Sequence, residues 1–372
     1  MQGLIGLLGL LLYLSIAAEA FEVMLLPRRV RRSLRFVRLF FRGSWGLWSG
    51  IARSMKRGPV RDAFLSLYGP LSMIVLLSSW AVGMIVGLGL LQWMLQSRSS
   101  KPFDVLSAIY FSGSSFFTVG YGDILPTTAL SKLLAVFEAF SGLAFMAVTI
   151  GYLPVLYQLF SQRETQIIKL DARAGSPPTA LALLCRHGEQ QAVDELQSFL
   201  LDWEQWCTVL VESHLSYPML SYYRSQHDNQ SWLAALTAIL DCCALLLTGF
   251  TGIRTFKARM TFAVARLAIV ELCRVFHLRV EGKSTERLTP ADFEAATKLL
   301  ADAGFSFSDE AGAEENLRQI RATYEPFLFA LSRLFLLDLP GWLPSEAMDN
   351  WQRSSRGRSA KKLVEAAPTK PL

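Results

Sequence analysis

The sequence is poor in the residue types that build catalytic and metal centres. Its 372 residues include four histidines and five cysteines. No Walker, nucleophile-elbow, zinc-protease or dinucleotide-binding pattern is present, so we expect neither an enzyme nor a bound cofactor. The cysteine spacings fit no zinc site or disulfide framework, and we expect buried, reduced thiols. These cysteines are Cys185, Cys207, Cys242, Cys243 and Cys273.

Acidic residues are absent from one long stretch. Residues 27–61 hold eleven Lys and Arg and no Asp or Glu, although the whole chain carries a net charge of only +6. This local charge favours contact with anionic lipid headgroups and argues against a nucleic-acid-binding domain. Apolar residues recur there at helical spacing opposite the arginines, which predicts an amphipathic helix in the membrane interface. The apolar set is Val30, Leu34, Val37, Phe41 and Trp48.

A voltage-sensing helix is the alternative interpretation of this stretch. Arginines stand at every third position from Arg29 to Arg38, a spacing that voltage sensors use. Further arginines at positions 28 and 31 leave no broad apolar side to cross a bilayer, and a single hydrophobic run precedes the stretch. We therefore favour the interfacial helix.

Long apolar runs are what the sequence does contain. Hydrophobic residues make up 52% of the chain, and three runs reach the ~20 residues that a membrane-spanning helix needs. They cover about 3–26, 70–95 and 130–160. We predict an all-α, polytopic membrane protein. The first run could be a cleaved signal peptide, but its basic residues follow the apolar run, which favours a retained anchor helix.

Charge also predicts the topology. Loops rich in Lys and Arg stay on the cytoplasmic side, so residues 27–61 are expected there, with the N-terminus outside. The second run then crosses outward and the third returns, which places everything after Arg163 in the cytoplasm. The expected location is the inner (plasma) membrane.

The second half of the chain is expected to be a soluble helical domain. Thr179, and Thr289 followed by Pro290, are predicted helix starts, and Gly304 is a predicted stop. Residues 233–253 are apolar enough to suggest a fourth membrane helix. Asp241 divides them into two short halves, so we favour a buried core helix.

Between the second and third apolar runs lies a short helical segment followed by a loop. Residues 103–117 are too few to span a bilayer, and residues 118–123 read Thr-Val-Gly-Tyr-Gly-Asp. Irregular backbone is tolerated at membrane depth where it is enclosed by protein or lines a water-filled path. Glycines at 120 and 122 permit the backbone angles that aim successive carbonyls at one axis, where they replace the water around an ion. We expect Val119 and Tyr121 to pack behind such a loop.

This motif is the signature of potassium channels, and the layout resembles the bacterial two-helix ion-channel family over roughly residues 70–160. The resemblance implies a homotetramer that conducts K⁺ through a filter of Thr118, Val119, Gly120, Tyr121 and Gly122, flanked by Asp123. It also implies an outer helix, pore helix, filter and inner helix. The expected divisions are an N-terminal helix at 1–26, a basic linker at 27–62, a pore domain at 63–162, a cytoplasmic domain at 163–348 and a disordered tail at 349–372.

The resemblance further suggests gating positions in the third run. Gly142 stands where such channels often have a flexible glycine, although close packing is an equally weighted alternative. Helical spacing places Leu143, Met146 and Ile150 toward the cavity, and Pro154 with Gly151 can kink the helix. Two gate positions are considered: an inner gate at Ile150 and the filter itself.

Some positions depart from the family pattern. Phe117 replaces a small or hydroxyl residue before the filter threonine. Ser114 stands where some bacterial channels carry a glutamate that pairs with the aspartate after the filter, so inactivation based on that pair is in doubt. Tyr110 and Phe111 fill the usual aromatic cuff. The rival functions are a non-selective cation channel and a sensor or interaction protein that retains a pore-like segment.

Overall fold

The computed structural model describes residues 2–26, 36–96, 103–226, 230–280 and 286–344. Within these residues the protein is helical, and its one pair of bridged extended residues is Phe250 with Phe307. The chain divides into two compact units, Met1–Gln158 and Leu159–Leu372. We had expected the division at residue 162. The predicted tail and the arginines at positions 28–35 lie outside the described residues.

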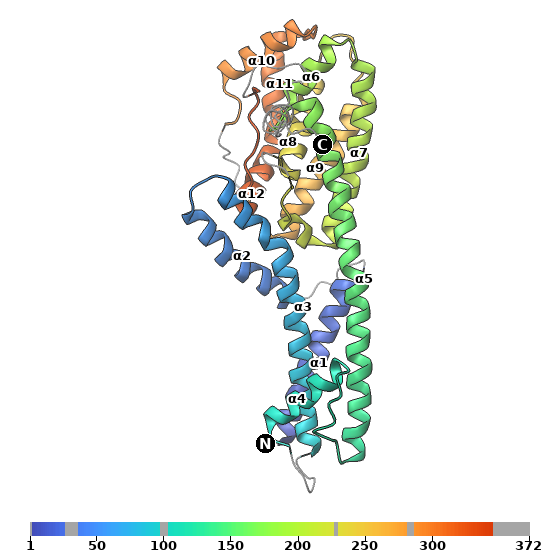
Figure 1. Ribbon diagram of the computed structural model, residues 1–372. Coiled ribbons are helices and arrows are strands. Elements are labelled where there is room, and N and C mark those ends of the chain that lie inside the picture. Colours follow the sequence, from blue (N-terminus) through green and yellow to red (C-terminus); the bar gives the residue numbers. More distant parts are fainter. Residues whose placement is uncertain (1, 27–35, 97–102, 227–229, 281–285, 345–372) are drawn as a thin grey trace, which may run out of the picture. The chain divides into compact units, whose positions relative to one another are not determined.

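Three helices of the described chain are long and apolar enough to cross a membrane. They are α1 (Gln2–Met24), α3 (Pro59–Gln96) and α5 (Ala129–Ala174), and the first unit contains α1, α3 and most of α5 (Figure 1). Both α3 and α5 are longer than the apolar runs that predicted them. The last turns of α5 continue into the second unit, where Ile167 and Leu170 are buried.

Helix α2 (Phe36–Ser54) packs against the first turns of α3 (Figure 1). Trp48 stacks on Phe64 with ring centroids 4.4 Å apart, and Trp45 meets Tyr68 edge-on at 4.8 Å. The predicted helix therefore exists over these residues. Part of its apolar side, including Phe41, is buried within the protein, where we had expected contact with lipid. A second row of large apolar side chains is exposed: Phe36, Leu39, Leu47 and Ile51.

The second unit is a bundle of short helices that follows the end of α5. Thr179 caps the first of them by accepting a hydrogen bond from the Ala182 amide. Thr289 and Asp292 form a reciprocal capping box, and Gly304 has a left-handed φ of 89° just past the helix end. All three predicted boundaries are confirmed. The helices are α6 (Ala180–Glu189), α7 (Val193–Ser216), a 3₁₀ helix (Pro218–Tyr222), α8 (Trp232–Leu247), α9 (Phe256–Val275), α10 (Pro290–Asp302), α11 (Glu310–Ala322) and α12 (Glu325–Phe335).

Helix α8 forms the centre of this bundle. Every residue from Trp232 to Leu246 is buried, and α6, α9, α11 and α12 pack around it. At 16 residues it is too short to span a bilayer. The interpretation as a buried core helix is therefore confirmed. The five cysteines are also free and buried, as predicted. Burial raises the pKa of Cys185 to about 11, so this thiol stays protonated at neutral pH.

Candidate functional site

The segment between α3 and α5 begins with a short helix, α4 (Val105–Phe116). Asp104 caps its start by accepting a hydrogen bond from the Ser107 amide at 3.3 Å. One side of α4 is buried, through Ala108, Phe111, Ser112 and Phe116. The helix ends at Phe116, immediately before the loop that the sequence singles out.

The loop backbone has a two-residue repeat. Thr118, Gly120 and Gly122 have positive φ values of 55°, 63° and 77°, whereas Val119 and Tyr121 do not. Such alternation turns successive carbonyl groups toward one side of the chain, and glycine permits it without steric cost. The backbone of Thr118 is strained, because a β-branched residue rarely adopts a positive φ. Other contacts of the loop must offset this strain.

Ser114 holds this loop to the end of α4. Its carbonyl accepts the Val119 amide at 2.8 Å, and its Oγ accepts the Gly120 amide at 3.1 Å. The sequence marked Ser114 as a departure from the family pattern but did not indicate this role. A short hydroxyl side chain six residues before the glycine can reach the loop backbone.

Tyr110 bonds to the residue that follows the loop. Its hydroxyl donates to Asp123 Oδ2 at 3.0 Å. This tyrosine was expected in an aromatic cuff, and its role as partner of Asp123 was missed. The spacing of 13 residues across a helix end gives no periodic signal from which to predict the contact.

Two large loop side chains are exposed in the single chain. Val119 is 50% exposed and Tyr121 is 72% exposed. The packing that we expected behind the loop is therefore not made by the described residues of the chain. On α5, Leu143 and Ile150 are exposed and Met146 is partly exposed. Together they form an apolar surface that the described residues leave largely uncovered.

Gly142 is a point of close contact between α5 and α4. A Cβ at this position would overlap the carbonyl oxygen of Phe116, the last residue of α4. Close packing, one of the two roles considered for this glycine, is thus the role that its surroundings support. Pro154 lies inside α5, which continues as a helix on both sides of it.

Buried polar side chains join the three elements around the loop. Ser112 on α4 donates to Glu138 Oε1 on α5 at 2.7 Å, and the other oxygen of Glu138 has no hydrogen bond among the described residues. Gln92 on α3 donates to the Ser131 carbonyl at 3.2 Å and accepts from its hydroxyl. An ionisable residue buried at membrane depth is costly and commonly functional. Sequence reasoning missed Glu138 because its partners lie far away in the chain.

Comparison with known proteins identifies this region. Residues 71–158 match the protein family described as ion channel. They cover α4, the loop, and most of α3 and α5. The chain is a helical membrane protein that carries an ion-channel domain.

Two curated proteins are similar to parts of the chain. The uncharacterized membrane protein YdjJ of Bacillus subtilis is 25% identical over 185 residues, which cover 48% of this chain and 52% of that protein. Potassium channel subfamily U member 1 of Mus musculus is 27% identical over 112 residues, which cover 30% of this chain and 9% of that protein. The chain thus matches about half of one relative's length and a small part of the other's. No solved structure matches it.

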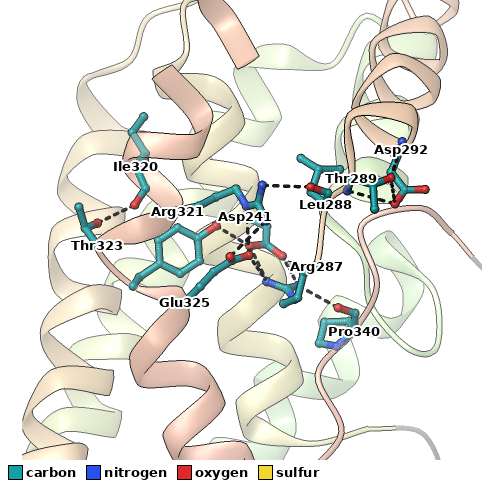
Figure 2. A network of polar contacts seen from close by, with 11 residues as sticks. Asp241, Arg287, Leu288, Thr289, Asp292, Ile320, Arg321, Thr323, Glu325 and Pro340 are labelled. Carbon is teal, nitrogen blue, oxygen red and sulfur yellow. Dashed lines mark hydrogen bonds and ion pairs between the residues drawn. The ribbon is translucent and has the colours of Figure 1, made fainter. Parts of the chain in front are cut away.

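A network of charged residues lies in the core of the second unit (Figure 2). Arg287 makes two hydrogen bonds to the Asp241 carboxylate, at 3.2 and 2.7 Å, and one to Glu325 at 3.1 Å. Arg321 holds the same Glu325 through two bonds, and Tyr324 donates to Asp241 at 2.6 Å. Two acids therefore balance two bases, which is how buried charge is tolerated.

The chemistry of this network is structural. Burial alone would lower the pKa of Arg287, but Asp241, Tyr324 and Glu325 raise it, so the guanidinium remains charged. Burial and Asp241 raise the pKa of Tyr324 well above its ordinary value, so the phenol stays neutral and donates. Among the described residues, no group of three or more His, Cys, Asp or Glu is placed to hold a metal ion.

An open cleft of about 270 Å³ runs between the last turns of α5 and α7 in the second unit. Gln166 and the Trp206 ring lie in its lining, with Lys169 and Asp202 among the charged residues there. Trp206 donates to the Arg163 carbonyl at 3.2 Å, which fastens α7 to α5. The cleft thus borders the helix that leads out of the ion-channel domain.

Proposed function

We propose that four copies of this chain form a potassium-selective channel that conducts K⁺ passively, with residues 118–122 as the filter and Asp123 flanking it. The observation that carries the proposal is the positive φ at every second loop residue, 118, 120 and 122, directly after a short helix between two membrane-length helices. A backbone of this kind presents rows of carbonyl oxygens, and rings of carbonyls replace the hydration shell of K⁺. The mouse relative named as a potassium channel supports the choice of ion.

Residues beside the loop support the same function. The negative end of the α4 dipole lies next to Phe117 and Thr118, where it favours a cation. The apolar surface of α5 and the exposed Tyr121 suit contact with neighbouring copies, because one loop cannot surround an ion. Four-fold assembly would supply the packing behind the filter that the described residues of one chain do not make.

The test is electrical recording from the purified full chain in lipid bilayers. With unequal potassium and sodium on the two sides, the reversal potential should lie near that of potassium. Gly120→Ala should abolish conduction because Gly120 has a φ of 63°. Gly113→Ala is the matched control: Gly113 lies in α4, and an added Cβ would make only an ordinary contact at 3.5 Å with Ile85. This control should conduct normally.

Other outcomes distinguish the rival functions. Equal passage of sodium and potassium would identify a non-selective cation channel. A wild-type protein that reconstitutes as an intact oligomer and passes no ion would favour a sensor or interaction protein. A trimer or dimer in native mass spectrometry would contradict the tetramer.

The proposed topology places α2 at the cytoplasmic surface, against anionic headgroups, and the N-terminus outside. Arg38, Arg42 and Arg53 are exposed on the same helix as the exposed apolar row of α2, which suits a helix at a membrane interface with anionic headgroups. Ser54 is exposed, so Ser54→Cys reports the side. A membrane-impermeant thiol reagent applied to intact cells should not label it, and should label it after the cells are opened. Labelling from outside would reverse the topology.

The proposed inner gate is a ring of Ile150 side chains, one from each copy. Ile150 is 72% exposed in the chain and lies one turn before Pro154. A narrow apolar ring holds water poorly and closes a pore by dewetting. Ile150→Asn should therefore raise the basal conductance, whereas Ile150→Leu, which keeps the ring apolar, should not. Unchanged open probability in an assembled Ile150→Asn channel would move the gate to the filter.

A further inference from the structure

One turn of α5, residues 137–142, is contacted by two different helices. From α1, the Tyr13 hydroxyl lies 2.7 Å from Ser141 Oγ, and the Tyr13 ring meets Phe137 edge-on with centroids 5.7 Å apart. Tyr13 is 8% exposed, so this contact is shielded. The helix before the two-helix pore is therefore joined to the inner helix itself.

The same turn of α5 supports the helix that presents the filter. Glu138 accepts the Ser112 hydroxyl from the middle of α4, and Gly142 abuts the Phe116 carbonyl at its end. Ser141 lies between these two contacts. A small rotation or shift of this turn would move both, and with them the start of the filter loop.

Close backbone packing fixes the register of Tyr13. A Cβ at Gly9 would come within 2.6 Å of the Gly87 carbonyl on α3, and a Cβ at Gly87 would come within 2.9 Å of the Tyr13 amide. Small residues let membrane helices approach at this distance. Helix α1 is thus held against α3 at the level where its tyrosine meets α5.

We propose that α1 is a positioning element of the pore, and that the bond between Tyr13 and Ser141 holds the α5 turn that supports the pore helix. Tyr13 and Ser141 lie outside the proposed filter and act through Glu138 and Gly142. The inference rests on the proposed channel function. A neutral hydrogen bond of this kind contributes enough to shift a two-state equilibrium several-fold.

The test is a double-mutant cycle on open probability in the full-length channel. Tyr13→Phe and Ser141→Ala should each shift the wild-type open probability by roughly two- to tenfold in the same direction. The double variant should shift it no further than either single one, because both remove one bond. Ser141→Thr keeps the hydroxyl and should restore wild-type behaviour. Ser79→Ala, which removes a hydroxyl bonded to its own helix at Leu76, should have no effect.

Amide hydrogen exchange on the same variants gives a readout that does not require current. Loss of the bond should speed exchange at residues 137–142 and in α4. Conducting variants with unchanged open probability, or additive effects in the cycle, would overturn the inference. A wild type that conducts no ions would contradict the proposed function instead, and unchanged exchange in Tyr13→Phe would then still overturn the role of α1.

Discussion

Asp241 in the second unit and Glu138 in the first are both acids buried within apolar helices, with exposures of 1% and 0%. Their surroundings differ. Asp241 receives two bonds from Arg287 and one from Tyr324. Glu138 has the neutral partners Ser112 and Gln92, and no ion pair to it is found among the described residues. Asp241 therefore has a charged partner, whereas Glu138 has neutral ones, although both lie inside apolar helices.

The difference shows how each unit tolerates a polar group in its interior. The second unit cancels charge with charge, and the guanidinium groups of Arg287 and Arg321 also face the Trp342 ring, at 5.7 and 5.5 Å. The first unit relies on neutral hydrogen bonds from serine, glutamine, threonine and tyrosine. Replacing a charged side chain of the Asp241 network should therefore lower stability strongly in the second unit. Replacing Glu138 in the first unit should lower it only slightly.

The largest effect is expected for Arg287→Ala. It would leave Asp241 and Glu325 buried without their shared partner, and breaking a buried ion pair typically costs ~3–5 kcal/mol. Opening of α8, measured by hydrogen exchange on the full chain, should become easier by that amount. Arg318→Ala is the matched control, because Arg318 bonds Glu315 at the surface, and it should leave α8 protection unchanged. Equal protection in both variants would contradict the role assigned to the network.

A paired amide substitution tests the comparison directly. Asp241→Asn removes the charge that Arg287 needs and should destabilise α8 by about 3 kcal/mol. Glu138→Gln keeps an oxygen that accepts the Ser112 hydroxyl and should change the stability of α4 and α5 by about 1 kcal/mol or less. Regional hydrogen exchange measures both. If Glu138→Gln lowers regional stability as much as Asp241→Asn does, Glu138 must also have a charged partner.

His214 predicts a smaller, pH-dependent effect in the second unit. Burial, and then the nearby Arg163, lower the pKa of His214 to about 3, so the folded protein holds it neutral. The unfolded chain binds a proton near the ordinary pKa of about 6.5, so stability is present above that pH and is lost as pH falls below it. The loss should reach about 2 kcal/mol at pH 5.

The effect of His214 is isolated by comparison with His214→Gln, since carboxylates also contribute to acid unfolding. The difference in unfolding free energy between wild type and variant should change by about 2 kcal/mol between pH 7 and pH 5. A constant difference across this range would show that His214 titrates equally in the folded and unfolded protein.

The smallest effect is expected at an exposed acid with a neutral partner. Tyr110→Phe removes the bond to Asp123, but both side chains are exposed, and water replaces the lost donor. The unfolding midpoint should be indistinguishable from that of the wild type. A clear decrease would indicate that neighbouring copies bury this pair in the assembled protein.

Local features of the sequence were sufficient for much of the fold. The three membrane-length helices followed from apolar length, because an uninterrupted apolar helix is what a bilayer requires. The caps at Thr179 and Thr289 followed from side chains that bond the next turn of their own helix. The length of α5 did not follow, because its last turns are stabilised by packing in the second unit.

The sequence by itself determined where the chain can span a membrane and where a glycine-containing loop can present carbonyls, since both depend on neighbouring residues. Only the tertiary structure decided which buried groups meet. Glu138 finds Ser112 at a separation of 26 residues, Asp241 finds Tyr324 at 83, and Tyr13 finds Ser141 at 128. No periodicity encodes such pairs. They depend on how closely whole helices approach, which the packing of residues such as Gly9, Gly87 and Gly142 sets.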